Sequence, residues 1–294
     1  MSQRKIDTHQ HFWDLQAVEY PWLTPAAGPI YRTFEPAELE PQLRAAGVDG
    51  TVLVQSANSY EDTDSMLRQA DTYPWIEAVI GWAPLLRAQE AGEALDRYQR
   101  HPKFRGIRHL IHDEPNPNWV VQEQVLEGLQ QLADRKLIFE VVAVFPNHLK
   151  HVPTLAERFP DLTLVIDHLA KPPIKDQRLD PENGGSSLSI FQREEWSSQL
   201  AAAARYPNVY AKISGLNTAA NMENWSATDL QPYVDHAIAC FGADRLMFGS
   251  DWPVCVLAGD YAKVWEETNR TLAGRSAGEI EAILGGTAAR VYGI

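Results

Sequence analysis

The strongest constraint on the fold is an alternation, along the whole chain, between short apolar runs and longer segments with helical spacing. The short runs are rich in Val and Ile and are nearly continuous in apolar character, as expected for strands covered on both faces. Each is followed by a segment in which apolar residues recur every three to four positions, which indicates an amphipathic helix. Eight runs predict strands: Lys5–His11, Thr51–Gln55, Ile76–Trp82, Gly106–His112, Leu137–Val144, Leu162–His168, Val209–Ser214 and Arg245–Ser250.

Helix boundaries between these runs are marked by local signals. The segment Pro36–Ala46 has an apolar face and ends before Gly47, a residue type that accepts the positive φ of a helix C-terminus. Val121–Arg135 and Leu149–Phe159 have the same apolar spacing and precede the fifth and sixth runs. Successive βα units of this kind predict an α/β fold, a single-domain (β/α)8 TIM-type barrel over residues 1–294. The alternative is an open doubly wound sheet, but the Gly-x-Gly-x-x-Gly that marks such sheets after the first strand is absent.

Two connections are far longer than the few residues that usually join a strand to the next helix. Residues 12–34 follow the first run and carry several aromatic side chains and prolines, whereas residues 170–190 follow the sixth run and contain a Lys-Pro-Pro and a polar stretch. Barrel enzymes place their active sites at the carboxyl ends of the strands, where both loops begin. We therefore expect the aromatic loop to be either a pocket wall or a structural cover.

The charge balance excludes several classes of partner. Lys and Arg number 26 against 39 Asp and Glu, a formal net charge of -13, so nucleic acid and anionic membranes would be repelled. No run approaches the ~20 apolar residues of a membrane span, and two cysteines are too few for a disulfide framework. With no secretory signal ahead of the first run, these features predict a cytoplasmic protein that acts on a small molecule. A homodimer fits a barrel of this size because two-fold dimers are the commonest oligomers, although no stretch specifies one.

Ionisable side chains collect at the predicted strand ends, where a barrel keeps its chemistry. His9 and His11 are two residues apart in an extended run, so both imidazoles point to one side and can enter the barrel mouth. His168 ends the sixth run and Asp251 follows the eighth. These nitrogen and oxygen donors suit Zn2+ or Mn2+ and leave a coordination position for water, which predicts a metal-assisted hydrolase. Further ionisable residues at the same ends are Arg108, His109, His112, Glu140, Asp167 and Lys212.

Tryptophans also lie at or after the strand ends, at positions 13, 22, 82 and 252. An indole ring stacks well on the apolar face of a sugar, and its N–H can donate to a hydroxyl. Because large aromatic side chains are buried on average whatever they do, each of these can equally be a core residue. We take Trp13 and Trp82 as candidate substrate contacts.

Several motifs, in order along the chain, resemble the amidohydrolase superfamily. They are Asp-Thr-His-Gln-His-Phe-Trp at 7–13, Val-Gln at 54–55, Ile-Gly-Trp at 80–82, Asp-His-Leu-Ala-Lys-Pro at 167–172, Lys-Ile-Ser-Gly-Leu at 212–216, Arg-Leu-Met-Phe-Gly-Ser-Asp-Trp-Pro at 245–253 and Gly-Thr-Ala-Ala-Arg at 286–290. More narrowly, the set resembles the branch of sugar lactonases that includes the fuconolactonases and rhamnonolactonases, alongside dicarboxylate lactonases. The similarity runs the whole length of the chain.

This resemblance implies a distorted (β/α)8 barrel that hydrolyses a small lactone to its hydroxy acid. Asp251 matches the general base that takes a proton from the attacking water. Arg108 and Lys212 lie where a cation can hold the substrate or polarise its carbonyl group. Four residues match metal-binding positions of the superfamily: His9, His11, His168 and Asp251.

One departure from the superfamily pattern concerns the fifth strand. Many metal-dependent members present a His or a carboxylated Lys on the fourth or fifth strand, whereas this chain offers Glu140, with His148 and His151 only beyond the strand end. The resemblance therefore implies one divalent ion, zinc, that can bind but is not required. Without it, the histidines would hydrogen-bond the lactone or its water.

In lactone hydrolysis, the activation free energy comes mainly from the negative charge that develops on the carbonyl oxygen. A cation or hydrogen-bond donor placed beside that oxygen therefore lowers the barrier most. A bound metal, His168 or Arg108 can serve, while ionised Asp251 takes the proton of the water and returns it to the ring oxygen. We predict that Asp251, His168 and Arg108 are catalytic. The predicted substrate contacts are His9, His11, Trp13, Trp82, His112 and Lys212.

Two other functions stay open at this level. A decarboxylase or hydratase on the same barrel would use the same histidines and Asp251 but would need a firmly held metal, and a catalytically silent barrel would only bind a small polyol or acid. Among lactones, a dicarboxylate calls for several cations, and an uncharged sugar calls for hydroxyl donors and aromatic faces. Arg108, Lys171 and Lys212 beside the aromatic residues do not separate the two, and the motifs favour the sugar.

Overall fold

The computed structural model describes residues 4–175 and 187–294, and its centre is a sheet of eight parallel strands. The strands pair in sequence order from the first to the eighth, each with the next along the chain. Every predicted run overlaps one of them, so the prediction of a (β/α)8 barrel is confirmed. The strands are β1 (Ile6–Gln10), β2 (Gly50–Val54), β3 (Ile76–Gly81), β4 (Phe104–His109), β5 (Ile138–Val141), β6 (Thr163–Ile166), β7 (Val209–Ile213) and β8 (Leu246–Phe248).

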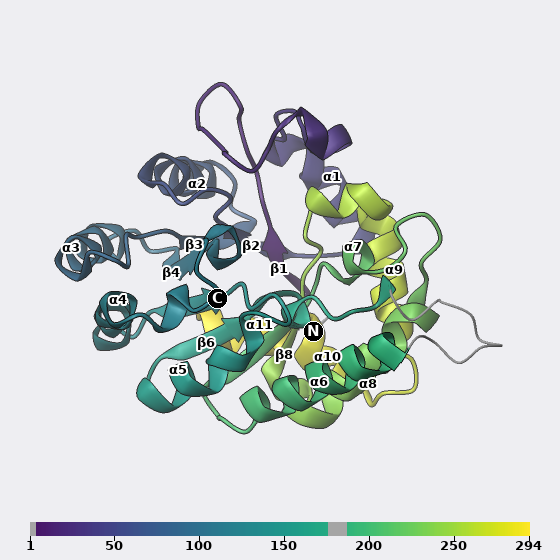
Figure 1. Ribbon diagram of the computed structural model, residues 1–294. Helices are drawn as coiled ribbons and strands as arrows, with labels where there is room; N and C mark the ends of the chain where they lie inside the picture. Colours follow the sequence, from purple (N-terminus) through teal and green to yellow (C-terminus); the bar gives the residue numbers. More distant parts are fainter. Residues whose placement is uncertain (1–3, 176–186) are drawn as a thin grey trace.

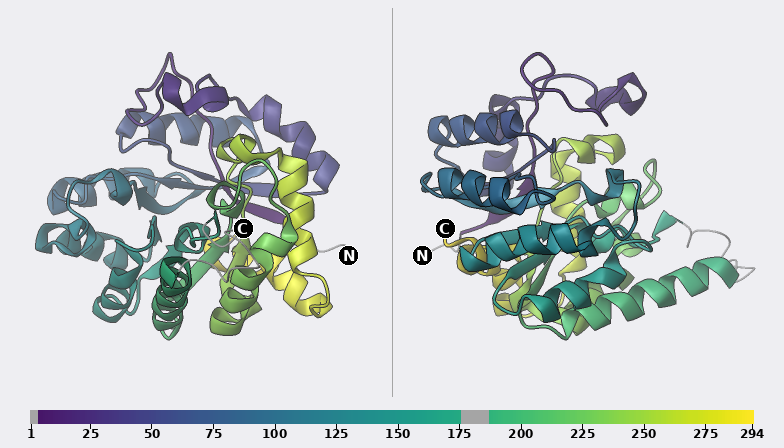
Figure 2. Two further views of the ribbon diagram at one scale, coloured as in Figure 1. Left: turned by 45° about the vertical axis from the view of Figure 1, so that its right-hand side comes forward. Right: turned by 60° about the vertical axis from the view of Figure 1, so that its left-hand side comes forward.

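Helices surround these strands on the outside of the barrel (Figure 1). The longer ones are α1 (Pro36–Ala46), α2 (Tyr60–Thr72), α3 (Ala88–Tyr98), α4 (Glu123–Asp134), α5 (Val152–Arg158), α6 (Ser187–Ala204), α8 (Ala227–Phe241) and α9 (Tyr261–Thr271). The shorter ones are α7 (Leu216–Ala219), α10 (Ala277–Glu281) and α11 (Thr287–Tyr292). Two further views show α6 along the outside of the barrel, where it contacts α5 and α8 (Figure 2). Within the described ranges, no helix has the length and apolar character that crossing a membrane requires.

The barrel closes between its first and last strands through the segment that follows β8. The His11 N–H donates to the Trp252 carbonyl oxygen at 2.7 Å, and the Asp251 N–H donates to the His9 carbonyl oxygen at 2.7 Å. Asp251 itself has a left-handed backbone, with φ of 60°. The bonds that close the barrel therefore also place the Asp251 side chain beside His9 in β1 and His11 just after it.

The chain leaves β6 through four consecutive residues in the left-handed region, His168–Lys171, with φ between 47° and 63°. Non-glycine residues adopt this conformation only where surrounding contacts enforce it. Here the Trp196 indole N–H of α6 donates to the Leu169 carbonyl oxygen at 2.8 Å, and the Phe145 N–H donates to the Ala170 carbonyl oxygen at 2.9 Å. These two bonds tie the turn to its neighbours, so the first and last side chains of the turn are held at fixed positions.

The first long loop, residues 12–34, acts both as a structural cover and as part of a pocket wall. Trp13 and Phe34 pair at its two ends, where the Phe34 N–H donates to the Trp13 carbonyl oxygen at 2.9 Å. The Phe34 ring then packs edge-on against Trp252, with ring centroids 5.3 Å apart, so the loop covers the segment that closes the barrel. Trp22 from the same loop lines a cavity. In the second predicted loop, residues 176–186 lie outside the described residues, and α6 begins at Ser187.

Replacing Gly106 with Ala is expected to lower the free energy of unfolding by about 1 to 3 kcal/mol. Gly106 in β4 faces Ile138 in β5, and an added Cβ would lie well within 3.0 Å of the Ile138 carbonyl oxygen, a backbone atom that cannot move aside. The matched control is Gly278→Ala in α10, where an added Cβ meets nothing within 4 Å. In chemical denaturation, the free energy of unfolding of Gly278→Ala should equal that of wild type or exceed it by up to about 1 kcal/mol, because Ala favours a helix more than Gly does. Equal stability of the Gly106→Ala variant and the wild-type chain would contradict this packing.

Candidate active site

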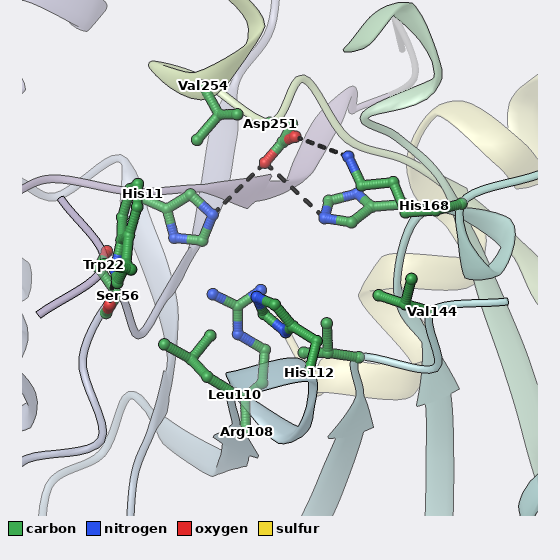
Figure 3. Close-up of a pocket in the computed structure, with 12 residues that line it drawn as sticks. His11, Trp22, Ser56, Arg108, Leu110, His112, Val144, His168, Asp251 and Val254 are labelled. Atoms are coloured by element: carbon green, nitrogen blue, oxygen red, sulfur yellow. Dashed lines mark hydrogen bonds and ion pairs between the residues drawn. The ribbon is translucent and has the colours of Figure 1, made fainter. Parts of the chain in front are cut away.

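A cavity of about 340 Å³ lies beyond the carboxyl ends of the strands, a size that suits a small ligand (Figure 3). One part of its lining is polar, and the rest is aliphatic or aromatic. The polar residues are His11, Ser56, Arg108, His112, His168, Lys171 and Asp251. The apolar residues are Trp22, Leu110, Val142, Val144 and Val254.

The carboxylate of Asp251 is surrounded by groups that favour its ionised form. Its Oδ1 lies 3.5 Å from His11 Nε2 and 3.8 Å from His168 Nε2, and its Oδ2 lies 3.8 Å from Lys171 Nζ. Figure 3 shows the two rings approaching Asp251 from different sides, with Arg108 across the cavity. Burial alone would raise the pKa of Asp251, but His168 and Lys171, which are both cationic at low pH, hold that pKa well below its usual range. Asp251 is therefore a carboxylate at neutral pH and can accept a proton.

The two histidines beside Asp251 are neutral, and one of them has a defined tautomer. His11 Nδ1 lies 2.7 Å from the Val54 carbonyl oxygen and must donate to it, which leaves the lone pair on Nε2 directed at Asp251 and the cavity. His168 Nδ1 lies 2.8 Å from the Ser214 hydroxyl oxygen. Burial lowers the pKa of His11 and lowers the pKa of His168 to about 3. Both rings can therefore hold a water molecule by hydrogen bonds without adding charge to the site.

A buried ionic network lies beneath the cavity. Lys212 Nζ lies 2.5 Å from Glu140 Oε2, 3.4 Å from Asp167 Oδ1 and 3.2 Å from His9 Nδ1. The hydroxyl of Tyr292 in α11 donates to the second Glu140 oxygen at 2.6 Å. All five side chains are buried, and none of them lines the cavity. The structure thus places Lys212 and His9, two predicted substrate contacts, in the layer that supports the cavity lining.

Arg108 joins this network to the cavity. Its NH1 lies 3.2 Å from Asp167 Oδ2 and 3.2 Å from His9 Nε2, and its NH2 donates to the Gln55 carbonyl oxygen. Burial would raise the pKa of Asp167, but His9, Lys212 and Arg108 hold it well below its ordinary value. Arg108 is thus a fixed cation on the cavity lining, as its predicted catalytic role requires.

The structure does not place Trp13 or Trp82 in the cavity. The Trp13 ring is buried and its indole N–H donates to the Arg32 carbonyl oxygen at 2.6 Å. The Trp82 indole N–H donates to His109 Nδ1 at 3.1 Å. Each indole N–H has a protein partner, and neither ring is part of the lining of this cavity. Trp22, which packs edge-on against Trp13 with ring centroids 5.5 Å apart, is the tryptophan of the first loop that faces the cavity.

Lys171 is a cavity residue to which the sequence assigned no role beyond that of a rim cation. Its Nζ donates to the Gly215 carbonyl oxygen at 3.1 Å and to the Thr218 hydroxyl at 3.0 Å. An ammonium group has three N–H donors, so one of them stays available for Asp251 or for a ligand. The one feature of the sequence that points to Lys171 is its position three residues after His168. In an ordinary strand-to-helix loop, a residue at that position would lie away from the site. His112, predicted as a substrate contact, does line the cavity, at its exposed edge.

Comparison with known proteins identifies the family. The family model for amidohydrolases matches residues 6–294, which is nearly the whole chain. The chain belongs to the amidohydrolase family. This confirms the resemblance seen in its motifs. The amidohydrolase is 37% identical over 257 residues to the L-fucono-1,5-lactonase of Burkholderia ambifaria, an alignment that covers 87% of this chain and 83% of the relative. It is 34% identical to the L-fucono-1,5-lactonase of Burkholderia multivorans, over 100% of this chain and 97% of the relative.

A solved structure resembles this amidohydrolase over its full length. It is an amidohydrolase from Burkholderia multivorans with bound zinc, with a TM-score of 0.89, 33% identity and 99% coverage of both chains. Two ligand atoms bound tetrahedrally to one zinc ion are about 3.3 to 3.6 Å apart. In this amidohydrolase, His9 Nε2 and His11 Nε2 are 3.1 Å apart, and they lie 3.8 and 3.5 Å from Asp251 Oδ1.

These spacings, and the lone pair that His11 directs inward, fit a divalent metal. Two overlapping groups of described residues bring three ligand atoms within 4.8 Å of one another: His9, His11 and Asp251 in one group, and His9, Asp167 and His168 in the other. His168 Nε2 adds a ring nitrogen 3.8 Å from Asp251 Oδ1. Three of the four ligands predicted from the sequence therefore form one group that can hold zinc, and the fourth, His168, lies beside it.

Proposed function

We propose that this amidohydrolase opens a small sugar-derived lactone, such as L-fuconolactone or L-rhamnonolactone, to its hydroxy acid. The observation that carries the proposal is an ionised Asp251 that faces a small cavity together with two neutral histidines and a lysine. The names of the two Burkholderia relatives support the class of substrate. Proton release during hydrolysis of aldonolactones by the purified enzyme tests it directly.

In the proposed reaction, Asp251 activates water. The water sits between the Asp251 carboxylate and the Nε2 atoms of His11 and His168, which orient it toward the lactone carbonyl carbon. Asp251 takes the proton as the oxygen attacks, and the neutral acid then gives that proton to the departing ring oxygen. No other proton carrier is needed, because one carboxyl group serves both steps.

The negative charge that develops on the carbonyl oxygen needs a preorganised donor. Lys171 has one N–H to spare beside Asp251, and the Arg108 guanidinium lies on the same cavity lining. We assign the larger part of this role to Lys171, because its ammonium lies 3.8 Å from Asp251 Oδ2, beside the proposed water, whereas Asp167 and Gln55 hold Arg108 across the cavity. Zinc, when held by His9, His11, His168 and Asp251, would supply additional polarisation of the carbonyl or of the water.

The apolar part of the cavity favours a deoxysugar. Leu110, Val142, Val144 and Val254 offer aliphatic contacts where a hydroxyl group would find no partner. A methyl substituent of the lactone fits that surface, while its ring hydroxyls can reach the polar residues of the lining. A dicarboxylate would instead place a second charge near these aliphatic side chains, at a cost in desolvation.

We expect kcat/KM to be constant through acidic and neutral pH and to fall at alkaline pH only. Because the pKa of Asp251 lies below its usual range, the base stays ionised through acidic and neutral pH, and kcat/KM should be flat there. Burial lowers the pKa of Lys171 from its usual 10.5, so kcat/KM should fall as rising pH removes that proton, at a lower pH than for a free lysine. In Lys171→Arg the limb should move to higher pH, after subtraction of spontaneous lactone hydrolysis, because arginine keeps its proton. A limb at the same pH in both enzymes would assign it to another group.

The proposed reaction needs no macromolecular partner, because a small uncharged lactone requires neither a nucleic acid nor a membrane. Both cysteines are free, one of them buried, which agrees with a reducing compartment, and we place the enzyme in the cytoplasm. The homodimer stays a prediction that sedimentation or light scattering can test.

A further inference from the structure

The Nε2 atoms of His9 and His11 lie at hydrogen-bond distance from each other, so the tautomer of His9 decides which groups can occupy the space between them. His9 Nε2 and His11 Nε2 are 3.1 Å apart, and both rings are buried. His11 Nε2 carries a lone pair, because its Nδ1 donates to the Val54 carbonyl oxygen. When Lys212 donates to His9 Nδ1, 3.2 Å away, His9 Nε2 is protonated and donates to His11 Nε2. When His9 Nδ1 instead donates to Asp167 Oδ1, 3.3 Å away, His9 Nε2 also carries a lone pair, and two bare nitrogens point at one place.

The chain supplies its own cation at that place. Arg108 NH1 lies 3.2 Å from His9 Nε2, close enough to donate a hydrogen bond to the lone pair that would otherwise coordinate a metal. The guanidinium cannot easily turn aside, because it is also bonded to Asp167 Oδ2 and to the Gln55 carbonyl oxygen. A lone pair can accept a hydrogen bond or bind a metal, but it cannot do both at once.

We propose that Arg108 competes with a divalent metal for the Nε2 lone pair of His9 and thereby keeps zinc affinity low. Zinc binding must then displace Arg108 from His9 and must place a dication beside a buried guanidinium. Zinc should therefore bind weakly and exchange readily at this site, although the distances between the ligand atoms fit a zinc ion. This inference concerns metal binding alone and does not rest on the proposed substrate.

Zinc dissociation constants, measured without substrate by competition with a chromophoric chelator, test the proposal in two variants. Arg108→Met removes the competing donor and its charge. Arg108→Lys keeps the positive charge but ends short of the position of NH1. Each variant should bind zinc at least about tenfold more tightly than wild type, because a hydrogen bond from a charged donor to a ring nitrogen is lost. Circular dichroism and thermal melting establish that each chain is folded, and either folded variant is sufficient for the test.

Lys171→Met is the matched control for charge. It removes one positive charge 3.8 Å from the predicted ligand Asp251, but it removes no donor from a histidine nitrogen. Direct competition predicts that Arg108→Lys tightens zinc binding by more than Lys171→Met does. If Lys171→Met tightens binding as much as Arg108→Met while Arg108→Lys leaves it unchanged, the effect is general repulsion and the proposal is wrong. Unchanged zinc affinity in all three variants would overturn it as well.

Discussion

Asp251→Asn should lower kcat for lactone hydrolysis by at least about 10³-fold while changing KM little. The amide has the shape of the carboxylate and can still contact His11, His168 and Lys171, but it cannot take a proton from water. The substrate does not depend on that proton transfer to bind, so the loss falls on the chemical step. Initial rates over a range of lactone concentrations separate the two parameters.

The control for this variant is an identical substitution outside the cavity. Asp64→Asn in α2 removes a partly exposed carboxylate that pairs with Arg97 at 3.5 Å. Its kcat should equal that of wild type, and thermal melting should show that both Asn variants are folded. If Asp251→Asn kept kcat within tenfold of wild type, another group would have to be the base.

Lys171→Met should lower kcat by about 10² to 10³-fold, the usual consequence of removing one donor to a developing oxyanion. The bond from the spare ammonium N–H strengthens as negative charge grows on the carbonyl oxygen, so KM should change less than kcat. Lys171→Arg should restore part of kcat, because it keeps a charged donor in the same turn. Rates at saturating lactone measure both effects.

Lys175 offers a matched substitution, because it is an exposed lysine four residues further along the same segment. Lys175→Met removes the same charge from the same loop and should leave kcat unchanged. A loss of kcat in Lys171→Met that Lys171→Arg does not relieve at all, or an equal loss in Lys175→Met, would assign the effect to loop structure and would contradict the proposed role.

Strand periodicity explains why much of the site was predictable. His9 and His11 share one side of an extended run, and parallel strands of a barrel end on the same rim, so His168 and Asp251 had to arrive near them. Arg108 is next to last in β4, and its side chain is part of the cavity lining. These positions follow from local pattern and barrel topology alone.

The remaining site residues depend on tertiary contacts that no local pattern contains. Lys171 reaches Asp251 only because four residues without a glycine adopt left-handed backbone, held by bonds from other elements. Trp13 and Trp82 have sequence positions that suit a pocket, but each turns its N–H to a partner in the protein. Lys212 sits one layer lower than expected, because Glu140 and Asp167 bind its ammonium group below the cavity.

The central claim is that this amidohydrolase hydrolyses a sugar lactone with Asp251 as the base. Proton release should be followed with a panel of aldonolactones, including a 6-deoxy lactone, its parent with a hydroxymethyl group, and a dicarboxylate lactone, for wild type and Asp251→Asn, with and without a chelator. The account predicts turnover of the 6-deoxy lactone with kcat/KM of at least about 10⁴ M⁻¹s⁻¹ and a large loss in the variant. If no lactone is hydrolysed faster by wild type than by Asp251→Asn, while the folded enzyme holds stoichiometric metal, the claim is contradicted and a metal-dependent decarboxylase or hydratase becomes the better account.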